Sequence, residues 1–248
     1  MFGKRTVVVF SGAGLSAESG IPTFRDGNGL WENHRVEDVA SPEGWAADPQ
    51  LVLDFYAARF KNIQDAQPNE AHKALARLQD AFVVVNISQN IDDLLERAGC
   101  KYVQHLHGII TRGKCEHHRD ITMLDGDPNH QCDYFVNLTE PIKLGDKCVK
   151  CQGQMRPDVV WFGESVPLNF EDMQELAREV KYEKGVFICV GTSGQVQPAG
   201  LLISYFSQVP QKYIVDPKAR PIANYELRKG NAGVELPKLV DELLAETK

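Results

Sequence analysis

The chain has 248 residues, of which 43% are hydrophobic and 25% charged, and its formal net charge is −7. This composition is typical of a globular protein with a full apolar core, and the acidic balance argues against general affinity for nucleic acid. No apolar run reaches the roughly 20 residues of a membrane span, and the first residues lack a signal peptide's apolar segment, so we expect a cytoplasmic protein that binds neither membrane nor nucleic acid.

A β-prone run, Val7–Phe10, is followed closely by Gly12-Ala13-Gly14. A buried parallel strand that ends in a glycine-rich turn presents backbone N–H groups to the phosphates of a dinucleotide. We expect a helix to begin near Ser16 and to direct its positive end at those phosphates. Gly20 comes too late for the dehydrogenase fingerprint, and the polar segment Pro22–Asp26 predicts a mobile flap over the cofactor.

Further along the chain, strand-like and helical patterns alternate. The predicted strands are Val7–Phe10, Phe82–Ile87, Tyr102–Leu106, Val186–Val190 and Tyr213–Val215. The predicted helices are Glu70–Gln79, Ile91–Ala98, Phe170–Val180, Ala199–Phe206 and Leu236–Glu246. This alternation predicts an α/β, Rossmann-like domain with a parallel sheet that helices cover on both faces.

Two stretches interrupt the alternation. The first carries a predicted helix around Leu51–Asn62, and the second, from Gly108 to about Pro157, is rich in Cys, His, Asp and Gly. Because the second stretch cannot build an apolar core by itself, we expect a metal to hold it together. We therefore predict one domain over 1–248, with a core of about 1–36, 69–108 and 158–248. A smaller inserted part would consist of a helical segment, about 37–68, and a zinc module, about 109–157, with the active site between them.

Polar side chains follow two of the predicted strands. The segment Ser88–Asp93 begins where a strand ends, at the edge of the sheet where open α/β folds bind ligands, although Asn90 with Asp93 three residues on is also a helix N-cap pattern. His107 ends the next strand and precedes a glycine, with His105 two residues back on the same face. An imidazole, whose ordinary pKa is about 6.5, suits a base that works near neutral pH.

Five motifs that occur in order between Val7 and about Pro237 resemble those of the sirtuins, the NAD-dependent protein lysine deacylases. They are GAGLSAESGIPTFR at 12–25, SQNID at 88–92, HG at 107–108, VVWFGE at 159–164 and GTSGQVQPA at 191–199. The family usually has Thr at position 88 and often Asn where Asp216 stands. The resemblance implies NAD as co-substrate, proteins with acylated lysines as partners, and products that include nicotinamide and O-acyl-ADP-ribose.

The resemblance also implies roles for individual residues. His107 would be the base that takes a proton from a ribose hydroxyl, while Asn90 and Asp92 would orient the ribose and a water. The acyl-lysine tunnel is implied for Val160, Trp161, Phe162 and Gly163. The implied cofactor-binding residues are Gly12, Ala13, Gly14, Ala17, Thr23, Phe24, Arg25, Trp31, Gln89, Asn90, Ile91, Asp92, Gly191, Thr192, Ser193, Asp216 and Ala232.

The cysteines cluster in the second insertion. Cys148 and Cys151 have the two-residue spacing with which a turn presents both thiolates to one tetrahedral zinc. We predict that Cys115 and His118, where sirtuins usually carry two cysteines, complete a structural site. Cys132 is the rival fourth ligand, and a degraded module without metal is the alternative.

One helical pair bears on the acyl group. Tyr56 and Arg59 stand three residues apart, so they share a face of the predicted helix, and together they suit a carboxylate. Alone the pair is also compatible with an arginine paired to a surface acid. In sirtuins it lies where some members select malonyl-, succinyl- and glutaryl-lysine, so we expect removal of acidic acyl groups as well as acetyl.

Other functions on the same fold remain open at this point. An NAD hydrolase or ADP-ribosyltransferase would keep the NAD motifs but needs no peptide-binding strand, so the apolar segment Val159–Glu164 counts against it. A non-catalytic NAD sensor predicts loss of His107 or Asn90, and both are present. We therefore expect an NAD-dependent deacylase.

Overall fold

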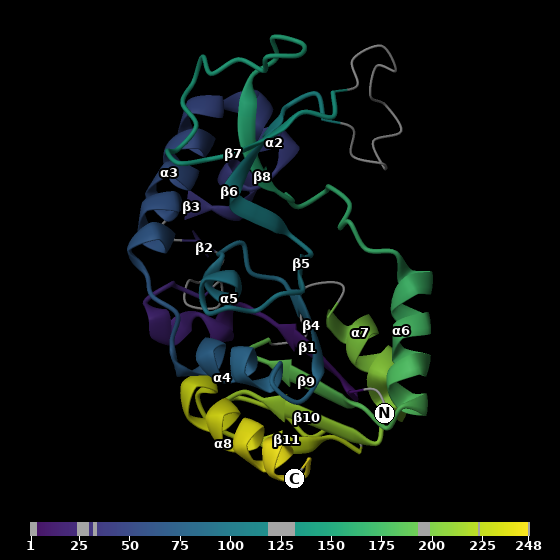
Figure 1. Cartoon of the computed structure of the whole chain (residues 1–248). Helices are drawn as coiled ribbons and strands as arrows, with labels where there is room; N and C mark the ends of the chain where they lie inside the picture. The colour runs from purple at the N-terminus through teal and green to yellow at the C-terminus, as the bar shows by residue number, and fades with distance from the viewer. Residues whose placement is uncertain are drawn as a thin grey trace.

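Six parallel strands form the larger sheet, in the order β11-β10-β9-β1-β4-β5 (Figure 1). They are β1 (Thr6–Ser11), β4 (Val83–Ser88), β5 (Val103–His105), β9 (Val186–Val190), β10 (Gln211–Val215) and β11 (Glu226–Arg228). This computed structural model describes residues 4–23, 30–31, 34–118, 132–192, 199–222 and 224–247. The central strands β1 and β9 are almost continuous apolar runs, as strands buried on both faces require.

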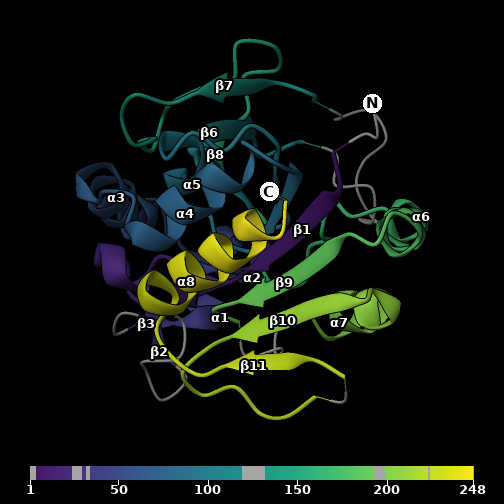
Figure 2. The same ribbon diagram turned by 60° about the horizontal axis from the view of Figure 1, so that its bottom comes forward.

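Helices cover both faces of this sheet (Figure 2). On one face, α4 (Glu70–Leu78) and α8 (Ala232–Ala245) share an apolar cluster with Val7 and Val9 of β1. On the other, α6 (Phe170–Tyr182) and α7 (Ala199–Tyr205) share one with Val8 and Phe10. Successive side chains of a strand point to opposite faces, so β1 alone supplies both layers. The predicted α/β class with a parallel, Rossmann-like sheet is confirmed.

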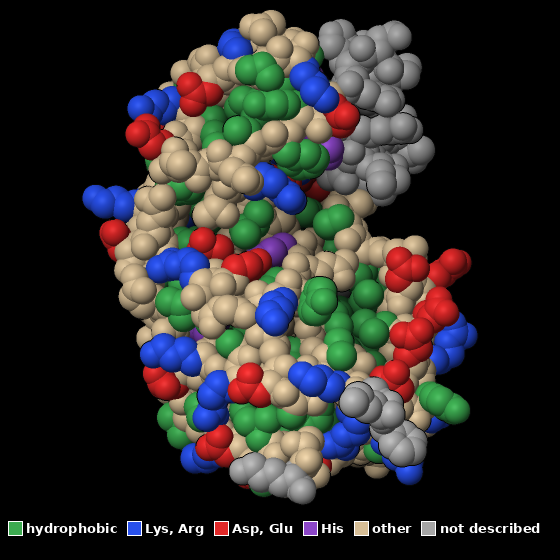
Figure 3. Space-filling model, viewed as in Figure 1, with side chains coloured by type: hydrophobic (Ala, Val, Ile, Leu, Met, Phe, Trp, Pro, Cys, Tyr) green, Lys and Arg blue, Asp and Glu red, His purple; other side chains and the backbone are tan. Residues whose placement is uncertain are grey.

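A smaller part lies at the opposite end of the molecule from α8 (Figure 1). Its three-stranded antiparallel sheet has the order β7-β6-β8, with β6 (Gly108–Cys115), β7 (Phe135–Asn137) and β8 (Met155–Val159). Beside it lie α1 (Val36–Val39), α2 (Pro42–Ala47), α3 (Pro49–Asp65) and the short strands β2 (Leu30–Trp31) and β3 (His34–Arg35). In space-filling view the surface is indented between the two parts (Figure 3).

Several local predictions were wrong. Instead of an α-helix near Ser16, two short 3-10 helices occur at Ala13–Leu15 and Ala17–Ser19, and Gly20 ends them with a φ of 83°. The helix expected over 91–98 is one turn, α5 (Leu94–Arg97), because residues 89–93 extend along the end of the sheet. The apolar segment 159–164, for which no strand was predicted, leaves β8 after Val159, and its Gly163 adopts a left-handed conformation. In the described part of the chain, no helix combines the length and apolar character needed to cross a membrane.

Candidate active site

The turns after β1 and β9 interlock. Gly12 N donates to Val190 O at 3.0 Å, and Gly14 N donates to Gly191 O at 2.9 Å. A Cβ on Gly14 would lie 2.6 Å from the Gly191 Cα, and Gly191 itself has a φ of 63°. The two glycines of the first turn are therefore needed to pack it against the second. Because β4 and β9 flank β1 on opposite sides, this is also the point where the sheet connections change direction, the usual ligand site of open α/β folds.

Ser16 lies at the centre of a buried hydrogen-bonded network below these turns. Its hydroxyl donates to Asp92 Oδ2 at 2.8 Å and accepts from Asn90 Nδ2 at 3.0 Å. His72 Nε2 lies 3.4 Å from the same hydroxyl. His72 Nδ1 accepts from the backbone N–H of Asn69, so Nε2 carries the ring hydrogen and donates to Ser16. The predicted residues Asn90 and Asp92 thus share one serine.

Burial sets the protonation states in this network. It lowers the pKa of His72 to about 4, which agrees with the neutral tautomer that its hydrogen bonds define. Burial also raises the pKa of Asp92, opposed by hydrogen bonds from Ser16 and from the backbone N–H of Leu94. Because all these groups are buried and partnered, the network holds Asn90 and Asp92 in one orientation.

His107 and His105 differ in their hydrogen bonds. His107 Nδ1 is 2.8 Å from Gln89 O, and a carbonyl only accepts, so the neutral ring carries its hydrogen on Nδ1 and its lone pair on Nε2. His105 donates from both nitrogens, to Asn90 O at 2.9 Å and to Glu96 Oε1 at 2.8 Å. Burial would lower the pKa of His105, but Glu96 and the neighbouring acceptors outweigh it and raise the pKa. The two rings therefore differ in their hydrogen positions: neutral His107 carries its hydrogen on Nδ1, whereas His105 donates from both nitrogens.

Gln89 joins the two ends of the site. Its backbone N–H donates to Ser11 O at 2.9 Å, and its side-chain oxygen accepts from Thr192 Oγ1 at 3.1 Å. Ile91 O in turn accepts from Ile110 N of β6 at 2.9 Å. The segment 89–92 therefore contacts the large sheet on one side and the small sheet on the other.

The remaining predicted cofactor residues occupy different places. Asp216 follows β10 and accepts from Lys218 N, and Ala232 begins α8, where Gly233 N donates to Glu18. Ala13 and Ala17 lie in the 3-10 helices, Thr23 lies at the end of the described segment 4–23, and Trp31 lies on β2. Phe24, Arg25 and Ser193, together with most of the predicted flap, lie outside the described residues.

Tyr56 and Arg59 lie on α3 with both side chains buried, 1% and 6% exposed. The Arg59 guanidinium lies over the rings of Phe55 and Trp31, 3.3 and 4.7 Å from their centres, and donates to Phe55 O. Burial raises the pKa of Tyr56, so its hydroxyl stays protonated and remains a donor.

Two buried donors lie next to each other in this region. The Tyr56 hydroxyl and the Trp161 indole N–H are neighbours, yet neither has a well-formed hydrogen bond to any residue that the structure describes. An indole N–H only donates, and buried donors are nearly always paired in folded proteins. The two donors therefore mark a place that a polar ligand group would complete.

The segment after β8 carries the predicted tunnel residues Val160, Trp161, Phe162 and Gly163. Val160 N donates to His107 O at 2.9 Å, and Phe162 N donates to Ala40 O at 2.9 Å. The segment therefore runs from the candidate base to the helical insertion.

Buried charges fix Trp161 within that segment. Its backbone N–H donates to Glu164 Oε2 at 2.9 Å, and the other carboxylate oxygen pairs with Arg156. The Arg156 guanidinium also lies 3.7 Å from the centre of a Trp161 ring. Lys114 Nζ is 4.0 Å from Glu164, and all three charged side chains are buried.

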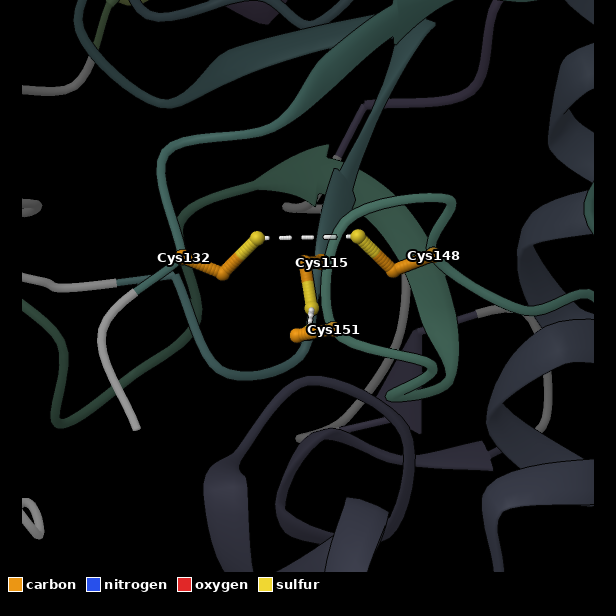
Figure 4. Close-up of side chains that lie close together, drawn as sticks. All are labelled: Cys115, Cys132, Cys148 and Cys151. Carbon is orange, nitrogen blue, oxygen red and sulfur yellow. Dashed lines mark hydrogen bonds between the residues drawn. The ribbon is translucent and has the colours of Figure 1, made fainter. Parts of the chain in front are cut away.

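Four cysteines converge at the far end of the small part, with their sulfurs pointing toward one another (Figure 4). All four Sγ atoms lie within 4.8 Å of each other, with Cys115–Cys151 at 3.3 Å and Cys132–Cys148 at 3.5 Å. The preferred fourth ligand, His118, is not in this group. Its Nδ1 donates to Cys132 O, and its ring packs on Phe135. An isolated β-bridge pairs His118 with Cys132, and Cys132, the rival ligand, thereby supplies the fourth sulfur of the cluster.

The donor set fits zinc. A tetrahedral zinc with Zn–S bonds of about 2.3 Å places its sulfurs about 3.8 Å apart, close to the separations in this cluster. The cysteines are free of disulfides, and four thiolates leave no open coordination position, so the site is structural. The predicted structural zinc is supported with four sulfur ligands in place of three sulfurs and one nitrogen.

Sequence reasoning missed Ser16 and His72 as residues of the site. Ser16 stands inside the glycine-rich motif but has no feature that distinguishes it from Ser19. His72 could have been found, because Asn69 and His72 have the spacing of a capping box, in which the side chain of the third helical residue reaches back to the cap. That pattern predicts a buried, neutral histidine at the start of α4.

Comparison with known proteins agrees with the fold. A model of the Sir2 family matches residues 12–198. An NAD-dependent protein deacylase of Vibrio vulnificus (strain YJ016) is 44% identical, over 98% of this chain and 96% of its own. One of Pyrococcus furiosus is 41% identical, over 95% and 92%. A crystal structure of a Sir2 homologue with NAD superposes with a TM-score of 0.80, 38% identity and coverage of 99% and 91%. The chain belongs to the Sir2 family.

Proposed function

We propose that this protein removes acetyl and acidic acyl groups, such as succinyl and malonyl, from lysine side chains of other proteins. The general activity, NAD-dependent protein deacylation, rests on membership of the Sir2 family and on full-length relatives that carry this activity in their names. The interlocked turns after β1 and β9 and the Ser16 network provide the backbone amides and fixed polar groups that an NAD site needs.

Each catalytic group has a distinct task in this proposal. NAD, when bound, supplies the ribose carbon that nicotinamide leaves and that the acyl oxygen attacks. His107, with its lone pair on Nε2, takes the proton from a ribose hydroxyl. Ser16 fixes the amide of Asn90 and the carboxylate of Asp92, which orient the ribose and a water. Of the remaining predicted cofactor residues, those at the carboxyl ends of β1, β4, β9 and β10 would bind NAD there: Gly12, Gly14, Gln89, Gly191, Thr192 and Asp216.

The choice of acyl group rests on one observation: within the described part of the chain, the buried donors of Tyr56 and Trp161 have no well-formed hydrogen bond. A methyl group, as in acetyl-lysine, leaves both of them unpaired, whereas a carboxylate accepts from both. The buried Arg59 guanidinium on the same helix supplies the positive charge. Val160, Phe162 and Gly163 would line the path of the lysine chain toward His107.

We also propose the division of the chain that the sequence predicts, with an NAD-binding core and an inserted helical and zinc part, and catalysis between them. The partners are proteins that present acylated lysine in an extended segment. A cytoplasmic location remains a prediction from the free cysteines, which an oxidising compartment would tend to pair.

The first experiment is mass-spectrometric turnover of one lysine peptide, carrying acetyl or succinyl, with and without NAD. We expect NAD-dependent loss of both groups and formation of O-acyl-ADP-ribose. Loss of acetyl alone would refute the acidic pocket. Consumption of NAD without loss of either group would instead indicate an NAD hydrolase or ADP-ribosyltransferase. In the same assay, the variant His107→Tyr should show no turnover while its fold stays intact.

The second experiment isolates the pocket. Arg59→Met should lower kcat/KM for the succinyl peptide by a factor that corresponds to about 2–5 kcal/mol, and should change deacetylation far less. Lys61→Met is the matched control, because Lys61 lies exposed on the same helix. Equal losses for both acyl groups would make Arg59 a structural residue.

A further inference from the structure

Trp45, on α2, packs in two apolar clusters at once. One cluster contains Tyr56 and Trp161, and the other contains the buried zinc-site cysteines Cys115 and Cys148. The rings of Trp45 and Trp161 have centroids 5.6 Å apart and are tilted by 37°. At this distance the position of one ring restricts the position of the other.

Glu116 links Trp45 to the cysteine cluster. Its Oε2 accepts from Trp45 Nε1 at 3.3 Å, and its Oε1 accepts from Gln154 N at 2.6 Å. Glu116 directly follows Cys115 in the chain, and its backbone N–H donates to Gln154 O at 2.9 Å. A change in the backbone at Cys115 therefore moves the carboxylate that orients Trp45.

We propose that Glu116 and Trp45 form a positioning relay that transmits the state of the cysteine cluster to Trp161, the indole that faces the acyl group. The contacts run without interruption from Cys115 through Glu116 and Trp45 to Trp161. This inference rests on the proposed function, because it assumes that Trp161 contacts the acylated lysine. Glu116 and Trp45 are positioning residues, since neither touches the groups that react.

The kinetic test uses two single variants and the double variant. Trp45→Phe keeps an aromatic ring at this position but removes the N–H donor. Glu116→Gln leaves one acceptor oxygen for the two N–H groups of Trp45 and Gln154. Each single variant should raise the KM for the acylated peptide about fivefold, the equivalent of one hydrogen bond, with kcat and the KM for NAD unchanged. The double variant should raise it no further, because both act on one contact. Glu43→Gln, exposed on the same helix, should have no effect.

Two kinetic results would overturn the relay: an unchanged peptide KM in Trp45→Phe, or effects that multiply in the double variant. Zinc content must stay at one per chain in the single variants. A loss of zinc from Trp45→Phe would show that Trp45 stabilises the metal site itself, and would also refute the proposal.

A second test does not depend on turnover. The chain has three tryptophans, so Trp31→Phe leaves emission from Trp45 and Trp161 alone, and Trp31→Phe/Trp45→Phe leaves Trp161. Exchange of zinc for cadmium, a larger ion that the four thiolates also bind, keeps the small part folded. It should shift the emission in the first variant and leave that of Trp161 unchanged in the second. An equal shift of Trp161 without Trp45 would refute the relay even if the wild-type chain showed no deacylation.

Discussion

The large and the small parts of this molecule are stabilised by different interactions. In the large part, Val7–Phe10 and Val186–Val190 are buried apolar strands between two layers of helices. In the small part, β8 buries Arg156 and Asp158, β6 buries Lys114, and four cysteines close the far end. The large part therefore depends mainly on apolar packing, whereas the small part adds buried charges and a metal site to apolar clusters of its own.

This contrast predicts where the molecule tolerates change. Apolar side chains of similar size replace one another at modest cost, because packing is spread over many neighbours. A buried charge or a metal ligand has no such substitute, since its partner stays behind in a medium that solvates it poorly. The small part should therefore fail at single positions, and the large part should not.

Removal of zinc has the largest expected effect. Structural zinc sites contribute on the order of 10–16 kcal/mol of binding free energy, which here stabilises only the small part. We expect chelation or Cys148→Ser to remove hydrogen-exchange protection from β6 and β8 and to leave it in β1 and β9. Cys100→Ala, at a buried cysteine outside the cluster, should keep one zinc per chain. Uniform loss of protection would show that the two parts unfold as one.

Next in size is the buried ion pair between Arg156 and Glu164. Glu164→Gln leaves the buried Arg156 guanidinium without its carboxylate partner, whereas Lys114 keeps Asp158 at 3.6 Å. The change should cost about 3–5 kcal/mol in the free energy of unfolding, measured with urea. Asp133→Asn breaks the exposed pair with Lys150 in the same part of the molecule and should leave the urea midpoint where it is. Similar midpoints for both variants would contradict the contrast.

A pH effect of about 3 kcal/mol is expected from His72, in the large part. Its pKa is about 4 in the folded state against 6.5 ordinarily, so the unfolded state binds the extra proton between these values. The stabilisation is complete above pH 6.5, falls as the pH drops toward 4, and changes no further below it. In His72→Gln the free energy of unfolding should vary less between pH 4 and 6.5. His105→Gln should leave this slope unchanged, because the raised pKa of His105 favours the folded state fully below pH 6.5 and loses that effect only as the pH rises above it.

The smallest effect should come from a single methylene in each part. Ile188→Val in β9 and Ile110→Val in β6 both shorten a fully buried side chain, and each should cost about 1 kcal/mol. If the two parts unfold separately, Ile188→Val lowers the melting temperature of the large part, and Ile110→Val that of the small part. A single transition that both variants shift equally would show that the two parts unfold as one cooperative unit.

The same contrast explains what could be predicted from the sequence. Periodicity and β-branched runs located β1, β4, β9 and α4 to within a residue or two, because burial of apolar side chains determines these elements. The short β11 was missed, since three residues of an edge strand carry too little pattern. The spacing of Cys148 and Cys151 indicated zinc, but the fourth ligand depends on how a chain folds back over distance. The residues near Cys115 in the sequence, such as Glu116 and His118, do not show that the chain returns to place Cys132 in the cluster.

At the candidate site, the motifs located Asn90, Asp92 and His107, but not the buried groups that hold them. Ser16 is one small polar residue among several, and its role follows only from the burial that directs three side chains at its hydroxyl. The proximity of Tyr56 to Trp161 depends on the packing of α3 against the segment after β8, which brings both residues into one buried cluster. Such contacts join residues about 100 positions apart, and no local pattern records them.

The interlocked turns also constrain the order in which the chain folds during synthesis. β1 pairs with β9 across about 180 residues, and Gly14 contacts Gly191 over a similar separation. At roughly 5–20 residues per second, ribosomal synthesis takes on the order of 10–40 s to bring the second turn out after the first. One edge of β1 stays without its neighbour throughout that interval, and the nucleotide-binding end of the sheet is completed last.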